Sequence, residues 1–393
     1  MQKILWIISE LFPPDETSTA YILGEVANAM AEKYVVKVIC GPEIYDKRKK
    51  LDPQNQFRLN SSIEVFRVTT LDVDKNTVKG KIGSVLSTSL KLTREVRQRV
   101  KSEDKVLMVT NPFPLIILMA YLKKKIGFEL NVLVHDIFPE NARPSNVFVP
   151  CEFIVKKIFD RAYACADLLV AIGRDMKIVL LEKVKSSRTH PRISIIENWA
   201  DIVNIKPEVN NNNDSIIIEY AGNIGRGQGL KSFIDIWAKA NNPLLHFDLY
   251  GTGAQEDSLK KYVKDIELQN VSFHGPYYRS QQNDVLNNCN IALVALEEGL
   301  YGLGVPSKTY NIMAAGKAIL FIGHPYSEIA LLVKEKKIGF VFRPEDNVGI
   351  QKFLAELRLV DMQEIREMGA RARKVAEEEF SKEIILGKFK KAI

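Results

Sequence analysis

Short apolar runs alternate with amphipathic stretches along most of the chain. The runs are rich in Ile, Leu and Val and lack regular polar alternation, which is typical of strands buried on both faces of a parallel sheet. The predicted strands are residues 3–9, 35–41, 62–70, 106–110, 130–134, 168–172, 216–220, 247–253, 290–296 and 318–322. Because loops and helical stretches separate these runs, the pattern predicts an α/β fold with doubly wound parallel sheets.

The chain divides into two predicted domains. Its 393 residues exceed what one ordinary core holds, and a polar linker at 209–215 separates two series of strands. We expect an N-terminal domain at 1–200, which ends in a crossing strand and loop at 193–201, and a C-terminal domain at 201–377. An amphipathic helix at 380–390, within a final segment of about 378–393, is expected to cross back to the first domain.

Composition fits a globular protein, with 46% hydrophobic and 26% charged residues. The sequence has no run of eighteen apolar residues, so we expect no transmembrane helix. The apolar start of the chain runs into Glu10 and is read as a first strand rather than a signal peptide. Cys40, Cys151, Cys165 and Cys289 are scattered without metal or redox spacing, which predicts reduced thiols in a cytosolic protein.

The net charge of +7 is concentrated in the first half of the chain. Residues 1–200 carry 31 basic and 23 acidic side chains, whereas residues 201–393 carry 24 and 25. A helix predicted at 84–101 adds to this: one face would carry Leu86, Leu90, Thr93, Val96 and Val100, with Lys91, Arg94, Arg97, Arg99 and Lys101 largely elsewhere. The basic surface is either solvated or faces an anionic membrane. Nucleic acid is the competing partner, but no nucleic-acid motif accompanies the charge.

Residues 304–319 form the most informative stretch, in which a glycine-rich turn leads into a short helix and a new strand. Pro306 suits the first turn of a helix, because its missing N–H costs nothing there. The N–H groups of Ser307 and Lys308 would then be unpaired and would face a ligand beside a cationic side chain. This arrangement predicts a diphosphate site. The alternative is an ordinary helix with a solvated lysine.

A second glycine-rich loop follows the strand at 216–220. Its sequence from Gly222 to Gly229 has four glycines at a strand–helix junction, which suggests close backbone approach to a phosphate. The run is Gly-x-x-Gly-x-Gly-x-Gly rather than Gly-x-Gly-x-x-Gly. It therefore argues against a dinucleotide cofactor such as NAD.

Polar residues also end the strand at 130–134, where His135 and Asp136 precede a proline-bearing loop. Open α/β sheets bind ligands at the carboxyl ends of their strands, so we favour a functional interpretation over a structural one. Asp72 and Asp74 form an Asp-x-Asp sequence of the kind that binds metal and diphosphate in other enzymes. We interpret it as a turn, because Asp favours turns by itself.

The sequence Pro-Ser-Lys-x-Tyr-x-x-x-Ala-Ala-Gly-Lys at 306–317 resembles the donor segment of retaining nucleotide-sugar glycosyltransferases of the GT-B fold. The resemblance extends over nearly the whole chain. It is strongest to family-four-like enzymes of bacterial surface polysaccharide synthesis, of the O-antigen, capsule and colanic acid type. It implies two Rossmann-like, doubly wound domains facing a cleft, with the acceptor bound by the first domain and the nucleotide-sugar by the second.

The resemblance also implies roles for individual residues. His135 and Asp136 would be catalytic, and no metal site is expected. The implied donor-binding residues are Ser18, Gly222, Asn223, Arg226, Gln228, Pro306, Ser307, Lys308, Tyr310, Asn311 and Glu328. Two glutamates that commonly frame the donor in this family are replaced here by Leu303 and Asn311. Ser18 stands in a first loop where the family usually has glycines.

The implied function is retaining transfer of a hexosyl or N-acetylhexosaminyl group from a nucleotide-sugar, expected to be a UDP-sugar. The acceptor would be a polyprenyl-diphosphate-linked or oligosaccharide molecule. No cofactor or divalent metal is expected, because Arg226, Lys308 and helix N-termini can stabilise the leaving diphosphate. The expected location is the cytoplasm, peripherally bound to the inner face of the plasma membrane. A sugar-nucleotide epimerase of the same fold and a non-catalytic nucleotide-sugar-binding protein remain alternatives.

Overall fold

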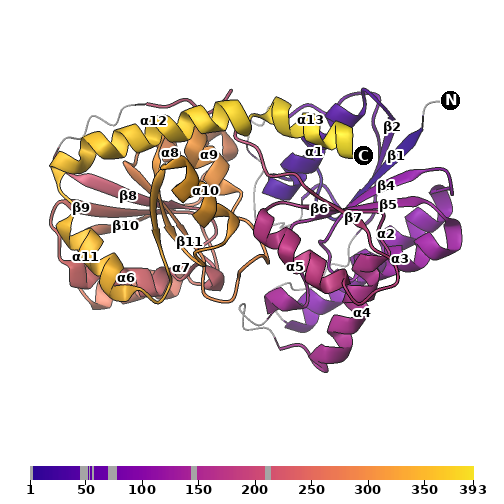
Figure 1. Cartoon of the computed structure of the whole chain (residues 1–393), viewed down its shortest axis with the longest axis horizontal. Coiled ribbons are helices and arrows are strands. Elements are labelled where there is room, and N and C mark those ends of the chain that lie inside the picture. The colour runs from indigo at the N-terminus through magenta and orange to yellow at the C-terminus, as the bar shows by residue number, and fades with distance from the viewer. Residues whose placement is uncertain are drawn as a thin grey trace. The chain divides into compact units, whose positions relative to one another are not determined.

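The computed structural model describes residues 3–44, 52, 54, 57–69, 78–142, 148–208 and 214–393. These residues form two compact units (Figure 1). The first unit contains the described residues up to Ile196 together with Leu386–Ile393, and the second contains those from Glu197 to Ile385. Asp72, Asp74 and most of the linker expected at 209–215 lie outside the described residues.

Within the described residues, the first unit has a seven-stranded parallel sheet in the order β3–β2–β1–β4–β5–β6–β7. Its strands are β1 Ile4–Ser9, β2 Val35–Cys40, β3 Glu64–Arg67, β4 Lys105–Val109, β5 Glu129–Val134, β6 Leu168–Ala171 and β7 Arg192–Ile195. Its helices are α1 Ser18–Met30, α2 Val78–Arg99, α3 Leu115–Ile126, η1 Glu140–Ala142, α4 Glu152–Ala164 and α5 Arg174–Val184. The central strands are almost fully buried, which explains their continuous apolar runs.

The second unit repeats this plan with a six-stranded parallel sheet in the order β10–β9–β8–β11–β12–β13. Its strands are β8 Ile216–Ala221, β9 Leu245–Tyr250, β10 Val271–Gly275, β11 Ile291–Ala295, β12 Ala318–Ile322 and β13 Gly339–Phe342. Its helices are η2 Arg226–Gln228, α6 Leu230–Ala240, α7 Glu256–Asp265, η3 Arg279–Gln281, α8 Gln282–Asn287, α9 Lys308–Ala314, α10 Glu328–Lys336, α11 Asn347–Glu356, η4 Leu359–Asp361 and α12 Met362–Glu379. The last helix of the chain, α13, spans Lys382–Ala392.

Both sheets reverse their strand order at one position, between β1 and β4 in the first unit and between β8 and β11 in the second. In doubly wound sheets, ligands bind at the carboxyl ends of the strands on either side of such a reversal. The prediction of two doubly wound parallel sheets is therefore confirmed. The loops that follow β8 and β11 are the two glycine-bearing segments identified in the sequence.

The prediction for the second helix of the first unit was partly wrong. Helix α2 begins at Val78 rather than near residue 84. Val96 and Val100 are buried as expected, but Leu86 is 47% and Leu90 59% exposed, because Leu92 faces the core instead. The apolar positions of α2 thus split between a buried face and an outward face.

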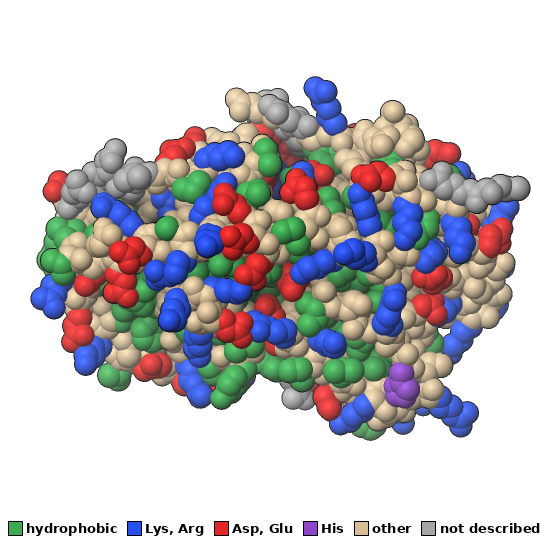
Figure 2. Space-filling model, turned by 45° about the horizontal axis from the view of Figure 1, so that its top comes forward, with side chains coloured by type: hydrophobic (Ala, Val, Ile, Leu, Met, Phe, Trp, Pro, Cys, Tyr) green, Lys and Arg blue, Asp and Glu red, His purple; other side chains and the backbone are tan. Residues whose placement is uncertain are grey.

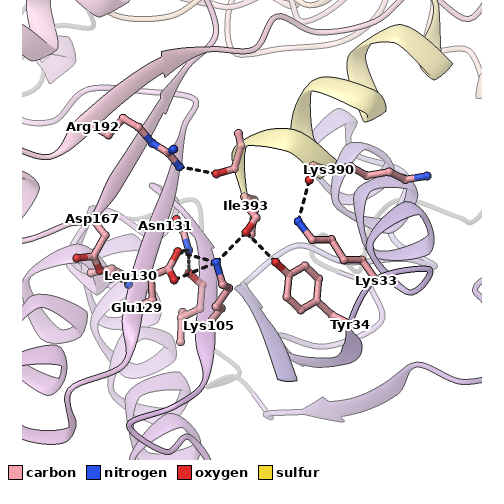
Figure 3. A network of polar contacts seen from close by, with 12 residues as sticks. Lys33, Tyr34, Lys105, Glu129, Leu130, Asn131, Asp167, Arg192, Lys390 and Ile393 are labelled. Atoms are coloured by element: carbon pink, nitrogen blue, oxygen red, sulfur yellow. Dashed lines mark hydrogen bonds and ion pairs between the residues drawn. The ribbon is translucent and has the colours of Figure 1, made fainter. Parts of the chain in front are cut away.

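The end of α13 packs onto the first unit through backbone oxygens (Figure 3). The hydroxyl of Tyr34 and the ammonium of Lys105 donate to the oxygen of Ile393, at 2.7 and 2.8 Å. Arg192 donates to the carbonyl of Ala392 at 2.5 Å. These bonds attach the last residues of the chain to strands β4 and β7 and to the residue before β2.

Figure 2 turns the face that carries α12 toward the viewer, and side chains of both charges are mixed on it. Helix α12 itself carries ion pairs one helical turn apart, between Arg373 and Glu377 and between Lys374 and Glu378. Arg373 also donates to the backbone oxygens of Ile202, Ile205 and Ala314. Helix α12 is thereby fastened to α9 and to the start of the second unit. No helix in the described part of the chain is long and apolar enough to cross a membrane.

Candidate functional site

The two loops at the reversal of the second sheet meet at Lys308. Lys308 is the first residue of α9, and its Nζ lies 3.4 Å from the centre of the Tyr220 ring at the end of β8. A Cβ atom on Gly222 would lie 3.6 Å from the same Nζ. The glycine-rich loop and the Pro-Ser-Lys segment, which are far apart in the sequence, therefore form one site.

The backbone of this loop approaches a neighbouring loop closely, and this explains one glycine in each of them. Gly222 has a φ of +147°, which side-chain-bearing residues rarely adopt. A Cβ on Gly251, which follows β9, would lie 1.9 Å from the carbonyl oxygen of Gly222. The loops after β8 and β9 thus pack backbone against backbone, and this holds the Gly222 loop beside Lys308.

The ammonium group of Lys308 has no hydrogen-bond acceptor among the described residues. Its Nζ is buried, although the side chain as a whole is half-buried. Burial lowers the pKa of Lys308 from 10.5 to about 7, and the carboxylate of Glu219 opposes this shift. Contact with the Tyr220 ring partly compensates the ammonium group of Lys308 for its lost hydration. An anionic ligand would supply the missing acceptor and favour the charged form.

Polar side chains of the loop surround Gly225. A Cβ on Gly225 would lie 2.7 Å from Nδ2 of Asn223 and 2.8 Å from Oε1 of Gln228. Oε1 of Gln228 is buried without a hydrogen-bond donor among the described residues. Arg226, in η2, is exposed. The loop therefore presents a cation and two amides from one short segment.

The starts of α9 and α10 lie at the same edge of the sheet. Pro306 and Ser307 come directly before α9, and Glu328 begins α10. Pro306 and Ser307 are half-buried, and Ser307 is the N-cap of α9 without a side-chain capping bond. Glu328 is the first residue of α10 and is buried. A carboxylate is favoured at that position by the helix dipole.

Two residues that are expected to bind the donor also make contacts within the second unit. Tyr310 is fully buried and packs against Phe380, with ring centroids 5.2 Å apart. The amide of Asn311 accepts from the backbone N–H of Asp201 and donates to Gln282, both at 3.1 Å. These contacts give the two side chains roles in packing and loop positioning, and their assignment to donor contact stays a prediction.

In the first unit, His135 and Asp136 follow β5, which pairs with β4 and lies one strand away from the reversal of the first sheet. The hydroxyl of Thr110, which follows β4, accepts from the backbone N–H groups of both residues, each at 3.2 Å. Nδ1 of His135 lies 3.2 Å from Oγ1 of Thr19 on α1. Ser18, the first residue of α1, is exposed, and Thr17 caps this helix instead. Hydroxyl groups from α1 and from the residue after β4 thus orient His135.

Burial controls the titration of this cluster. It lowers the pKa of His135 to about 4, because the ring loses water that would stabilise its charged form. Nε2 of His135 is buried without a partner among the described residues. The surrounding protein raises the pKa of Asp136, although this side chain keeps contact with solvent. At neutral pH, His135 is therefore an uncharged imidazole with one uncommitted ring nitrogen.

The structure adds residues that the sequence did not single out. Thr110 and Glu219 had no motif around them, and Tyr220 was visible only as the end of a strand. Glu219 interrupts the apolar run of β8, and a charged residue in a buried strand is a signal that could have revealed it. Ser18, His135 and Asp136 lie in the first unit, and all other predicted site residues lie in the second. Within the described residues, no group of three or more His, Cys, Asp or Glu side chains could hold a metal ion.

Comparison with known proteins identifies relatives of the chain. The sequence profile described as "Glycosyl transferases group 1" matches residues 201–375. A probable glycosyltransferase from Pseudomonas aeruginosa, WbjE, is 33% identical over 313 residues, which cover 77% of this chain and 76% of the relative. The putative colanic acid biosynthesis glycosyl transferase WcaI of Escherichia coli is 24% identical over 57% of this chain and 56% of its own length.

A solved structure shares the fold over almost the full length. The Anabaena protein HepE, in complex with UDP-glucose, superposes with a TM-score of 0.69 at 14% identity, covering 99% of this chain and 98% of that chain. The architecture of two parallel-sheet domains is that of the GT-B fold.

Proposed function

The chain belongs to the group 1 glycosyl transferases, and from this premise we propose that it transfers a sugar from a UDP-sugar to a lipid-linked or glycan acceptor. The transfer would retain the anomeric configuration and would serve the synthesis of a bacterial cell-surface polysaccharide. The sugar would be a hexose or an N-acetylhexosamine. The second unit would hold the donor and the first unit the acceptor.

The observation that carries this proposal is the buried ammonium group of Lys308, which has no hydrogen-bond acceptor in the described part of the chain. It lies beside Gly222 at the reversal of a doubly wound sheet, where such sheets bind their ligands. A diphosphate placed there would accept a charge-assisted hydrogen bond from Lys308. The backbone of the Gly222 loop would lie alongside it, and Arg226 would approach from the solvent side.

The similar proteins support a UDP-sugar as the donor and a role in polysaccharide synthesis. HepE was solved with UDP-glucose, and its fold matches along 99% of this chain. WcaI carries a putative role in colanic acid biosynthesis, and WbjE is a probable glycosyltransferase. We therefore propose UDP as the nucleotide and a surface polysaccharide as the product.

We propose that the reaction proceeds without a divalent metal. The leaving diphosphate gains negative charge in the transition state, and prepositioned cations stabilise that charge in place of a metal. Lys308 and Arg226 provide two such cations in the second unit. Transfer activity that survives exhaustive chelation would support this part of the proposal, and its loss with recovery on adding Mg²⁺ would contradict it.

His135 and Asp136 are proposed to act on the acceptor side. A neutral imidazole with a free Nε2 can accept a hydrogen bond from an acceptor hydroxyl. Because the leaving phosphate can take the proton of the attacking hydroxyl, His135 would position and polarise rather than serve as an obligatory base. Asp136 would orient the acceptor through its solvent-facing carboxyl group.

One experiment separates this function from its two alternatives. The purified protein is incubated with a panel of radiolabelled UDP- and GDP-sugars, with and without lipid extract that contains polyprenyl-diphosphate-linked acceptors. Label in the lipid fraction, dependent on extract, identifies a glycosyltransferase. An altered sugar recovered still attached to its nucleotide identifies an epimerase. Binding without either product identifies a non-catalytic protein.

A membrane surface is proposed as the second partner, on the helical layer α2–α5 of the first unit. Consecutive helices of this layer pack against each other. Its exposed large apolar side chains are Leu86, Leu90, Tyr121, Phe153, Ile154, Ile158, Ile178 and Leu181. Exposed basic side chains accompany them on the same helices, namely Arg94, Arg97, Lys124, Lys125, Lys157 and Arg161. Apolar side chains beside basic ones suit an interfacial position on an anionic bilayer.

A further inference from the structure

A second buried ionisable group lies near Lys308 and has no part in the function described above. Glu219, in β8, is 1% exposed, and neither of its carboxylate oxygens has a hydrogen-bond donor among the described residues. A carboxylate without partners is costly to bury, so such groups tend to take up a proton. Burial raises the pKa of Glu219 to about 8, far above its ordinary value of 4.5.

The charged neighbours of Glu219 shift its pKa in opposite directions. Asp248 is its register partner on β9, and its carboxylate adds to the rise in the pKa of Glu219. Lys317 and Lys308 oppose that rise. The charged and titratable groups that couple to Glu219 or Lys308 are Asp248, Lys317, Cys289, Tyr220, Tyr250 and Tyr277.

The other polar neighbours have partners of their own. Asp248 is bonded to Nε2 of His274 at 3.0 Å, and Lys317 donates to the backbone oxygens of Glu208 and Asn287. Glu219 and Lys308 are thus oppositely charged when ionised, electrostatically coupled, and both without a hydrogen-bond partner among the described residues.

We propose that Glu219 is a positioning residue for donor binding, which sets whether Lys308 meets the donor diphosphate as a cation. The inference rests on the proposed function, because it takes the diphosphate of a nucleotide-sugar as the ligand of Lys308. When Glu219 is ionised, its carboxylate favours the ammonium form of Lys308 in the empty site. A bound diphosphate stabilises the ammonium form of Lys308 in place of Glu219. Glu219 is then left protonated, so donor binding takes up a proton.

The direction of the pH dependence follows from this arrangement. Lys308 titrates at about 7, so it is a cation below this pH and becomes neutral as the pH rises through it. Donor affinity should therefore fall between about pH 7 and pH 9. Removal of the carboxylate charge, as in Glu219→Gln, deprives Lys308 of a stabilising partner and moves this loss of affinity to lower pH. In Lys308→Arg the cation no longer titrates in this range, and the dependence on pH should flatten.

The first test observes Lys308 without any ligand. Protein with lysine labelled by ¹³C at the ε carbon is titrated by NMR, and the signal of Lys308 is assigned from its absence in Lys308→Arg. We expect a midpoint in the neutral range, which Glu219→Gln shifts to lower pH. The control Glu345→Gln changes an exposed carboxylate of the same unit and should leave the midpoint in place. A midpoint near 10, or one that Glu219→Gln does not move, overturns the proposal.

The second test measures proton uptake on binding. Calorimetry with UDP-glucose in buffers of different ionisation enthalpy, at pH 7.5, should show uptake of a fraction of a proton by the wild type and less by Lys308→Arg. UDP-glucose is used because its diphosphate diester does not titrate near neutrality. Equal proton uptake by the wild type and by Lys308→Arg would overturn the proposal that donor binding is coupled to the protonation of Lys308. Absence of UDP-glucose binding at every pH contradicts the proposed UDP donor, whereas the NMR titration still decides whether Glu219 governs Lys308.

Discussion

Oγ1 of Thr19 lies 3.2 Å from Nδ1 of His135, which links the first turn of α1 to the carboxyl end of β5. The contact fixes the plane of the imidazole and leaves Nε2 as the nitrogen without a partner among the described residues. The backbone of His135 is held at the same time by Thr110. Two hydroxyl groups from separate elements therefore hold a residue that the sequence indicated only by its place at the end of a strand.

The buried imidazole should make the stability of the protein depend on pH in the acidic range. The pKa of His135 is about 4 in the fold, below the ordinary value of 6.5. A lowered histidine pKa contributes stability that is complete above 6.5 and is lost as the pH falls through 4. We expect the melting temperature of the wild type to fall more steeply between pH 6.5 and 4 than that of His135→Asn, as measured by calorimetry. Parallel curves for the two proteins would contradict a buried, neutral His135.

His135 should matter more for turnover than for nucleotide affinity. In His135→Ala we expect turnover to fall by about tenfold or more, whereas affinity for the nucleotide stays nearly unchanged, because the donor residues lie in the second unit. Steady-state transfer assays and calorimetric titration of UDP provide the two measurements. A well-folded His135→Ala protein with turnover within a fewfold of the wild type would show that the residue only supports its loop.

The helical layer α2–α5 should bind anionic vesicles. We expect sedimentation with phosphatidylglycerol vesicles at low salt, release at high salt, and weak binding to phosphatidylcholine alone. Phe153→Ser combined with Ile154→Ser should weaken the binding. Val348→Ser is a matched control, because Val348 in the second unit is 79% exposed, as is Phe153. Equal binding to both kinds of vesicle, or equal effects of both substitutions, would rule out this surface.

The bond between Tyr34 and the oxygen of Ile393 should contribute measurably to stability. Tyr34→Phe removes a buried donor and leaves the ring in place, so we expect a loss of about 1 kcal/mol in the free energy of unfolding. Lys105 still donates to the same oxygen, which limits the loss. Tyr121→Phe, at an exposed position, serves as the control. Denaturant titration that shows no difference between the two variants would mean that the end of α13 is held without Tyr34.

Much of the architecture could be predicted because the central strands are apolar and buried on both faces. The two glycine-bearing loops were also found, since glycine and proline mark strand–helix junctions. Strands β10 and β13 and helices α11 and α12 were not predicted, because edge strands and surface helices carry weaker apolar patterns. The resemblance indicated the segment around Lys308 as the donor site, which stays a prediction, but it could not tell that Tyr310 faces the core or that Asn311 holds a neighbouring loop. Those outcomes depend on Phe380, Asp201 and Gln282, which are distant in the sequence.

The donor site itself is tested most directly by calorimetric titration of UDP-glucose into the wild type, Lys308→Ala and Arg226→Ala. A charge-assisted hydrogen bond contributes about 1.5–3 kcal/mol, so Lys308→Ala should weaken binding by about tenfold or more. Arg226→Ala should weaken it less, because Arg226 is exposed. Lys231→Ala, which removes an exposed lysine paired with Asp235 on α6, should bind like the wild type. The account predicts this order of affinities, and equal affinity in Lys308→Ala and the wild type would contradict it.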